Sequence, residues 1–159
     1  MENNQELRAY FFNNMYLSGI HAGIQAQHCT AAMFVNYPND RISLGEFGDR
    51  AVNTLYSWAN HHKTTIILNG GYASNLYRIL NIVAIDSNPY PWGVFCESEE
   101  ALNSCITSVG IILPEKVFNY KKNLEQHYLE GGVIENYPVK LTEFELLLVE
   151  ELSQCGLMS

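Results

Sequence analysis

A strand-like run and a helix-like run meet at SGIHAGIQAQHCTAA, residues 18–32. The run before it, residues 8–13, reads RAYFFN and is apolar enough for a buried strand. Ser18 stands where a hydroxyl can accept a hydrogen bond from a free backbone N–H at the start of a helix. Open α/β sheets bind ligands and anions where the end of a strand leads into a helix. We therefore expect the functional site at this junction.

Successive residues of a helix turn by about 100°, so His21, Gln25 and His28 lie on one stripe of a predicted helix over 18–37. A neighbouring stripe of the same helix is apolar, and we expect it to face the protein core. That stripe contains Ile20, Ile24, Ala31 and Val35. The polar stripe then lies at the edge of the buried surface, where its imidazole and amide groups can reach a ligand.

The composition indicates one folded domain, 1–159, because the chain has 159 residues and 47% of them are hydrophobic. No stretch approaches the ~18 apolar residues of a membrane span, so no membrane partner is expected. Residues 1–6, MENNQE, lack the basic and apolar parts of a signal peptide, which favours a cytoplasmic protein. The four cysteines show neither CxxC nor zinc-ligand spacing, which predicts reduced thiols, no metal site and no other cofactor.

The charge balance limits the partners. The net charge is −8, and the nine lysines and arginines are scattered along the chain. Because phosphate contacts dominate affinity for nucleic acids, this balance argues against a large nucleic-acid footprint. It is compatible with a small nucleotide held by backbone amides and one or two cations.

The order of predicted elements indicates the α/β class. β-Branched and apolar runs predict four strands, at 8–13, 64–69, 92–97 and 108–113. Apolar periodicity predicts four helices, at 18–37, 44–60, 76–83 and 114–128, and a capping box at Thr142 and Glu145 begins a fifth. Residues 98–105 fit either a short helix or a hairpin connection. We expect a mixed four-stranded sheet flanked by helices, with a core over 8–122 and extra C-terminal helices within 123–159.

These landmarks resemble the archaeal and eukaryotic type of peptidyl-tRNA hydrolase. The family's first helix carries G-K-x-A-A-Q-x-x-H, of which Gln25 and His28 keep Q-x-x-H. Trp58 before KTTIIL, residues 63–68, is similar to the family's helix-tryptophan-strand segment. Residues 91–97 and 108–114 look like its third and fourth strands. The resemblance covers 8–122 and implies a peptidyl-tRNA hydrolase II-like fold.

The same comparison shows departures at the positions that carry the family's chemistry. The expected lysine of the first helix is His21, and the acidic residue after the third strand is Glu97, where the family has aspartate. The family's D-A-G-x-T turn is replaced by ESEEA, residues 97–101. If hydrolysis is retained, the resemblance implies His28 as the base, Glu97 as its orienting group and His21 as a cation.

Our leading expectation is a protein that binds and sequesters a small nucleotide, such as a cyclic dinucleotide defence signal, without catalysis. The composition is similar to that of small viral accessory proteins, so a phage immune-evasion protein in the host cytoplasm fits. The expected ligand-binding residues are Asn13, Asn14, His21, Gln25, His28, Glu97 and Ser108.

Two other functions stay open. One is an active peptidyl-tRNA hydrolase that cleaves the ester between peptide and tRNA. The other is a non-catalytic interaction protein or homo-oligomer, because an apolar set in the last predicted helix can form a dimer seam or cover the domain's own sheet. This set contains Phe144, Leu147, Leu148 and Leu152. His61 and His62 are interpreted as a solvated helix end, and Trp58 as a core residue.

Overall fold

A computed structural model describes residues 5–40 and 42–158 of the chain. Its centre is a mixed four-stranded sheet in the order β2-β1-β4-β3, which confirms the predicted class and sheet. The neighbours β1 and β2 are parallel, whereas β4 is antiparallel to both β1 and β3. The strands are β1 (Leu7–Asn13), β2 (Thr64–Asn69), β3 (Trp92–Cys96) and β4 (Ile106–Pro114). Every residue of β4 is buried, as expected for a central strand that is covered on both faces.

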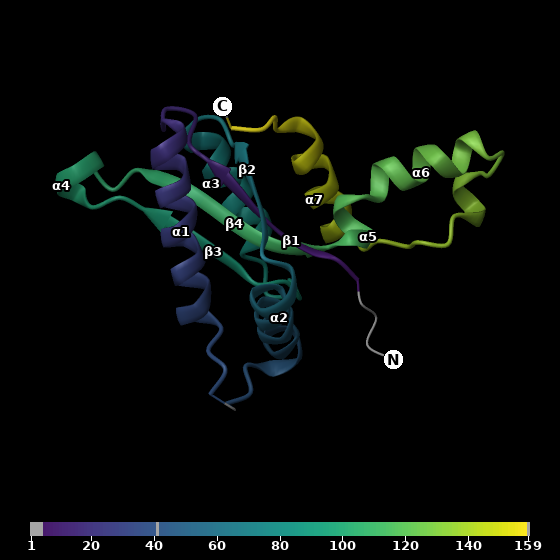
Figure 1. Ribbon diagram of the computed structural model, residues 1–159, viewed down its shortest axis with the longest axis horizontal. Helices are drawn as coiled ribbons and strands as arrows, with labels where there is room; N and C mark the ends of the chain where they lie inside the picture. The colour runs from purple at the N-terminus through teal and green to yellow at the C-terminus, as the bar shows by residue number, and fades with distance from the viewer. Residues whose placement is uncertain (1–4, 41, 159) are drawn as a thin grey trace.

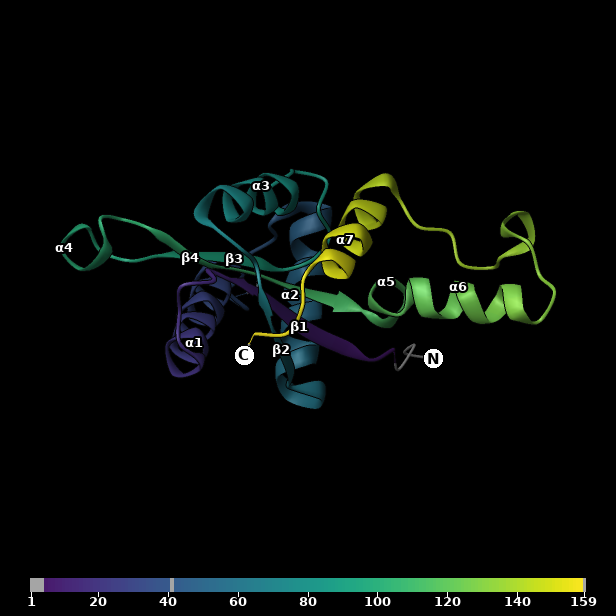
Figure 2. The same ribbon diagram turned by 90° about the horizontal axis from the view of Figure 1, so that it is seen from above.

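Helices cover both faces of the sheet. In Figure 2, α1 (Gly19–Asn36) lies on one side, and α3 (Ala73–Val83) and α7 (Glu143–Gln154) lie on the other. Because side chains alternate along β1, Phe11 packs with the α1 side and Phe12 with the α3 and α7 side. The α1 side also receives α2 (Gly45–Ser57) and the π-helical turn η1 (Trp58–His62). Trp58 is buried there, as predicted, and its indole N–H donates to the backbone oxygen of Thr64 at 2.9 Å.

The first helix begins where the sequence predicts, since the hydroxyl of Ser18 accepts a hydrogen bond from the backbone N–H of His21. The expectation about its buried face is wrong. Ile20 and Val35 are 80% and 78% exposed, and Ile24 and Ala31 are exposed as well. The buried residues are Ala22, Gln25, Ala26, Cys29 and Met33. Small side chains on this face let α1 approach the sheet closely, and the larger isoleucines are left outside.

Gly93 on β3 lies directly beneath α1 at this close approach. A Cβ atom at Gly93 would lie 2.8 Å from the backbone oxygen of Cys29 and 3.0 Å from the side chain of Met33. Only a residue without a side chain therefore fits beneath α1 at this point of the strand.

Residues 98–105 combine the two predicted alternatives. They connect the antiparallel strands β3 and β4, and they contain the single helical turn α4 (Glu99–Leu102), capped by the hydroxyl of Ser98. Asn103 and Ser104 then adopt positive φ angles, which turn the chain back toward β4. The resulting hairpin projects from one edge of the molecule (Figure 1).

The predicted helix over 114–128 is interrupted at Asn119, which leaves α5 (Glu115–Phe118) and α6 (Tyr120–Leu129). Figure 1 shows α6 extending away from the sheet, and none of its residues is buried. A short 3-10 turn, η2 (Ile134–Asn136), precedes the return of the chain.

The last helix, α7, returns to the core. Its capping box is present as predicted, with the hydroxyl of Thr142 accepting from the backbone N–H of Glu145. Phe144 and Leu148 are buried in the core, whereas Leu147 is 53% exposed. Beyond α7, Leu157 forms an antiparallel bridge with Leu68 of β2.

Within the described residues, no helix has the length and apolar character needed to cross a membrane.

Candidate functional site

The predicted residues Asn13 and Ser108 meet at the junction between β1 and α1. They are register partners on neighbouring strands, and both are completely buried. The hydroxyl of Ser108 donates to the side-chain oxygen of Asn13 at 2.8 Å, and the amide of Asn13 donates to the backbone oxygen of Ala22 at 2.7 Å. This chain of hydrogen bonds fixes the first turns of α1 against the centre of the sheet.

Gln25 connects α1 to the β3–β4 hairpin. Its side-chain amide donates to a carboxylate oxygen of Glu97 at 2.6 Å, and its side-chain oxygen accepts from the hydroxyl of Thr107 at 2.8 Å. Gln25 is only 6% exposed, so these bonds satisfy an amide that has left water. Thr107 was not among the predicted site residues. The signal for it was its place between the predicted Ser108 and the hairpin, within a strand whose other residues are nearly all apolar.

Asn14 stabilises the turn between β1 and α1 through its side chain. Its side-chain amide donates to the backbone oxygen of Ile106 at 3.3 Å, and its side-chain oxygen accepts from the backbone N–H of Tyr16 at 3.1 Å. Asn14 is 5% exposed, and these two bonds hold the turn between β1 and α1 in place.

His28 lies over the aromatic ring of Phe95. The two rings are stacked, with centroids 4.6 Å apart and an angle of 22° between their planes. His28 and His21 are both exposed. Among the described residues, neither imidazole has a hydrogen bond or ion pair to a carboxylate, and Glu97 bonds to Gln25 instead of His28. The structure therefore brings His28 and Glu97 to the same edge of α1 without joining them as a base and its orienting group.

We call this set of side chains the cluster: Asn13, Gln25, Glu97, Thr107, Ser108 and the stacked pair His28 and Phe95. The charged side chains around the cluster are negative. The elements α1, β3, α4 and β4 contain no lysine or arginine, while α4 adds Glu99 and Glu100 beside Glu97. Asn13, Gln25, Thr107 and Ser108 are buried and bonded within the protein, so the cluster offers a ligand the half-buried carboxylate of Glu97 and the exposed imidazole of His28. Such a set suits recognition of a neutral ring edge better than stabilisation of several phosphate charges.

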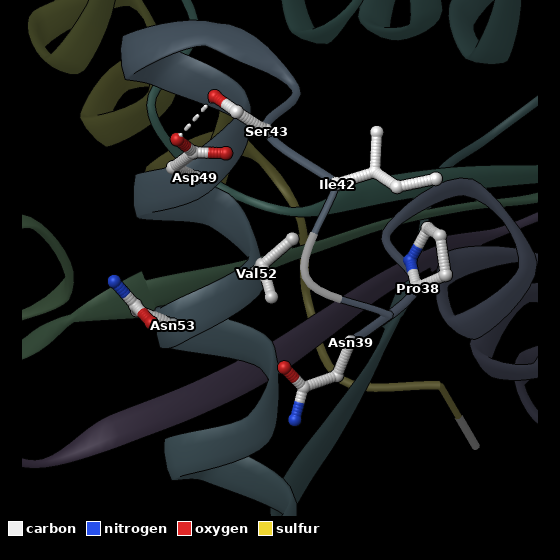
Figure 3. Close-up of a pocket in the computed structure, with 7 residues that line it drawn as sticks. All are labelled: Pro38, Asn39, Ile42, Ser43, Asp49, Val52 and Asn53. Carbon is white, nitrogen blue, oxygen red and sulfur yellow. Dashed lines mark hydrogen bonds between the residues drawn. The ribbon is translucent and has the colours of Figure 1, made fainter.

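Several hollows lie on the described part of the chain, away from this cluster. One of about 570 Å³ is lined by residues of α2, α7, Lys116 and the loop before β3. Phe47, Ile85, Phe144 and Leu147 form its apolar walls, and Arg50 and Lys116 are its cations. Figure 3 shows another hollow, of about 220 Å³, between α2 and the loop that leads into it. There the hydroxyl of Ser43 donates to Asp49 at 2.7 Å, and this bond is the main cause that lowers the pKa of Asp49. The Asp49 carboxylate on α2 thus holds the loop that precedes this helix.

All four cysteines are free thiols, and only Cys29 is buried. Within residues 5–40 and 42–158, no group of three potential metal-ligating side chains lies together.

Fold and site together define an α/β protein with a mixed four-stranded sheet and a polar cluster at the junction of β1 and α1. No protein-family model matches the chain, and a search of curated proteins finds no relative.

Proposed function

We propose that the protein binds a small nucleotide without catalysis, at the cluster beside His28. The observation that carries this proposal is the bridge from Gln25 to Glu97 and Thr107, which lies beside the exposed His28 stacked on Phe95. Preorganised hydrogen-bonding groups next to a flat aromatic surface are the parts with which proteins read and stack a base. The proposal includes a peptidyl-tRNA hydrolase II-like fold, supported by the order of segments that resembles that family.

A base is the part of a nucleotide that suits these groups. Gln25 occupies one carboxylate oxygen of Glu97, and the side chain of Glu97 is half-buried. The second carboxylate oxygen can accept from an exocyclic amino group or a ring N–H of a base. The outer face of the His28 ring, opposite Phe95, can stack on that base.

The arrangement gives little support to ester hydrolysis. A hydrolase needs an activated water and stabilisation of the developing oxyanion. Here Glu97 is bonded to Gln25, His28 is stacked on Phe95, and the surrounding elements hold no lysine or arginine. In the proposal the protein therefore sequesters its ligand intact. A cyclic dinucleotide defence signal, captured for a phage in the host cytoplasm, is the form that we favour.

The test is a thermal-shift and calorimetric panel of nucleosides, mononucleotides and cyclic dinucleotides, with recovered ligand analysed by mass spectrometry. A ligand at about 100 times its Kd adds about 2.7 kcal/mol to the stability of the folded state, which gives a clear shift. We expect at least one member to bind and to be recovered unchanged. Conversion of the ligand would show an enzyme instead, and no binding across the panel would overturn the proposal.

Variants locate the site. His28→Ala and Glu97→Gln are expected to weaken binding at least about tenfold, because each removes a direct contact. Two matched controls leave the contacts in place: His61→Ala removes another exposed histidine, and Glu100→Gln removes a neighbouring negative charge. Equal losses in the variants and their controls would place the ligand elsewhere.

A further inference from the structure

Glu97 presents two hydrogen-bond acceptors whose capacity the protein does not exhaust. Its Oε1 atom accepts from the side-chain amide of Gln25 at 2.6 Å. Its Oε2 atom has no hydrogen-bond partner among residues 5–40 and 42–158, and Glu97 is half-buried. Each carboxylate oxygen has two lone pairs, so Oε1 can accept a second hydrogen bond and Oε2 is free to accept. A ligand therefore meets a pair of adjacent acceptors at this place.

Gln25 fixes the direction of these acceptors. A carboxylate only accepts, so the NH2 group of Gln25 faces Glu97, and the amide oxygen faces the hydroxyl of Thr107, 2.8 Å away. Because Gln25 is buried and both ends of its amide are bonded, the amide cannot turn over without losing both hydrogen bonds. It therefore holds the carboxylate of Glu97 in one orientation, as a preorganised binding group requires.

The carboxylate lies within reach of a ring that is stacked on His28. Two contacts join α1 to the β3–β4 hairpin, one between Gln25 and Glu97 and the other between His28 and Phe95. Gln25 and His28 are three residues apart on one helix, where such neighbours lie about 5–6 Å apart. Phe95 and Glu97 are two residues apart along the hairpin, a spacing of about 7 Å in an extended chain. The two contacts are thus neighbours, and their separation is comparable with the length of a purine.

The common bases differ in how their edges meet two adjacent acceptors. Guanine has two neighbouring donors on one edge, the ring N1–H and the exocyclic N2 amino group. Adenine and cytosine each place an amino donor beside a ring-nitrogen acceptor, and uracil places its N3–H between two carbonyl oxygens. Each of these other bases turns a lone pair toward the carboxylate, which is repulsive. The remaining polar side chains of the cluster are buried and bonded within the protein, so they offer no compensating donor.

We infer that Glu97 makes the site specific for guanine, with N1–H and the N2 amino group donating to the two carboxylate oxygens and the base stacked on His28. This inference rests on the proposed function, since it requires that a nucleotide binds at the cluster. It narrows the ligand to a guanine nucleotide, and among cyclic dinucleotides to those that contain guanine. Two hydrogen bonds from the base also satisfy a carboxylate that has no lysine or arginine on α1, β3, α4 or β4.

Calorimetry with ligands that differ only in the base tests the inference. GMP, IMP, AMP, CMP and UMP share the ribose and phosphate, and IMP is GMP without the N2 amino group. The cyclic dinucleotides with two guanines, two hypoxanthines or two adenines form a second series. In at least one series we expect the guanine member to bind at least about tenfold more tightly than the adenine member, because a bidentate pair discriminates by about that factor. The hypoxanthine member keeps N1–H alone and is expected to bind with intermediate affinity.

Glu97→Gln tests the role of the carboxylate through a change of preference. In this variant the side-chain oxygen stays beside Gln25 and the new NH2 group donates, which matches the amino donor and ring acceptor of adenine. The ratio of guanine affinity to adenine affinity is expected to fall at least about tenfold. Glu100→Gln removes a negative charge from the same hairpin and leaves the acceptor pair in place, so its ratio should equal that of the wild type. Thermal melting confirms that each variant is folded.

The outcomes separate the guanine preference from nucleotide binding as such. An adenine or pyrimidine ligand that binds at least as tightly as the guanine ligand, and whose binding His28→Ala weakens, would overturn the inference and leave the proposed function standing. A guanine preference that Glu97→Gln does not reduce would also overturn the inference, because another group would then read the base. No binding of any nucleotide would overturn both proposals.

Discussion

The side-chain amide of Gln25 donates a 2.6 Å hydrogen bond to the carboxylate of Glu97, although 72 positions separate the two residues in the chain. The bond joins the middle of α1 to the base of the β3–β4 hairpin. Thr107, on the returning strand, completes the contact by donating to the oxygen of the same amide. One glutamine thus links three segments that are distant in sequence.

This bridge leads to a first prediction about stability. Gln25→Ala removes the hydrogen bond to the carboxylate of Glu97 and leaves the hydroxyl of Thr107 with only its 3.2 Å bond to the backbone oxygen of Phe95. This loss is expected to lower the free energy of unfolding by about 1–3 kcal/mol. Urea unfolding followed by circular dichroism measures the change. Gln126→Ala is the control, because that exposed amide bonds only to Glu130 one turn away. Similar losses in the two variants would show that the bridge adds no stability of its own.

The close approach of α1 to β3 gives a second prediction. Gly93→Ala introduces a methyl group 2.8 Å from the backbone oxygen of Cys29, so the helix must move outward. We expect a loss of about 1–3 kcal/mol in the free energy of unfolding, as for other overpacked cores. Gly156→Ala is the control, since a Cβ there meets no atom within 4 Å. If Gly93→Ala unfolds at the same urea concentration as the wild type, the packing of α1 is looser than described.

A third prediction concerns pH. Burial alone would raise the pKa of Glu145, but hydrogen bonds from Lys116, Tyr90 and the backbone of Thr142 outweigh it and lower the pKa. The Lys116 and Tyr90 contacts measure 2.6 Å and 2.5 Å. A carboxylate with a lowered pKa stabilises the fold above its ordinary value of 4.5, and this contribution is lost as the pH falls through the lowered pKa.

The measurement compares Glu145→Gln with the wild type by urea unfolding at neutral pH and at about pH 3. At neutral pH the variant is expected to be less stable by about 1–3 kcal/mol, because it weakens a buried, charge-assisted network. The gap should narrow on acidification, as the wild-type carboxylate takes up a proton. The exposed neighbour Glu143→Gln should show a small change at both pH values. A gap that stays constant with pH would contradict the assignment.

The cysteines give a fourth prediction. Burial raises the pKa of Cys29 to about 12, against hydrogen bonds from Ser108 and the backbone of Gly110 that act in the opposite direction. Because the thiolate is the reactive form, iodoacetamide should modify Cys29 at least about a hundredfold more slowly than the exposed Cys96 in the native protein. Peptide mass spectrometry measures both rates. In strong denaturant the two rates should converge, and equal rates in the native state would contradict the burial of Cys29.

Local patterns in the sequence were sufficient for the elements and for much of the candidate site. The β-branched run of β2 and the hydroxyl caps at Ser18 and Thr142 act within a few residues of themselves, so they can be recognised without knowing the fold. Asn13 and Ser108 were identified because they stand on strands next to the expected junction, and the structure pairs them. The partners of Gln25 were not predictable, since hydrogen bonding across 72 residues has no local signal.

By itself, then, the sequence determined the α/β class, the order of the elements and the helix that begins at Ser18, because propensity and capping act over one or two turns. Tertiary structure decided which face of α1 is buried. Apolar residues stand on two sides of that helix, so periodicity alone pointed to the side of Ile20 and Ile24. The space above Gly93 admits the side with Ala22, Ala26 and Cys29 instead. It also decided that α7 covers the sheet and that Leu157 pairs with β2, because both depend on long-range contacts that form only once the sheet exists.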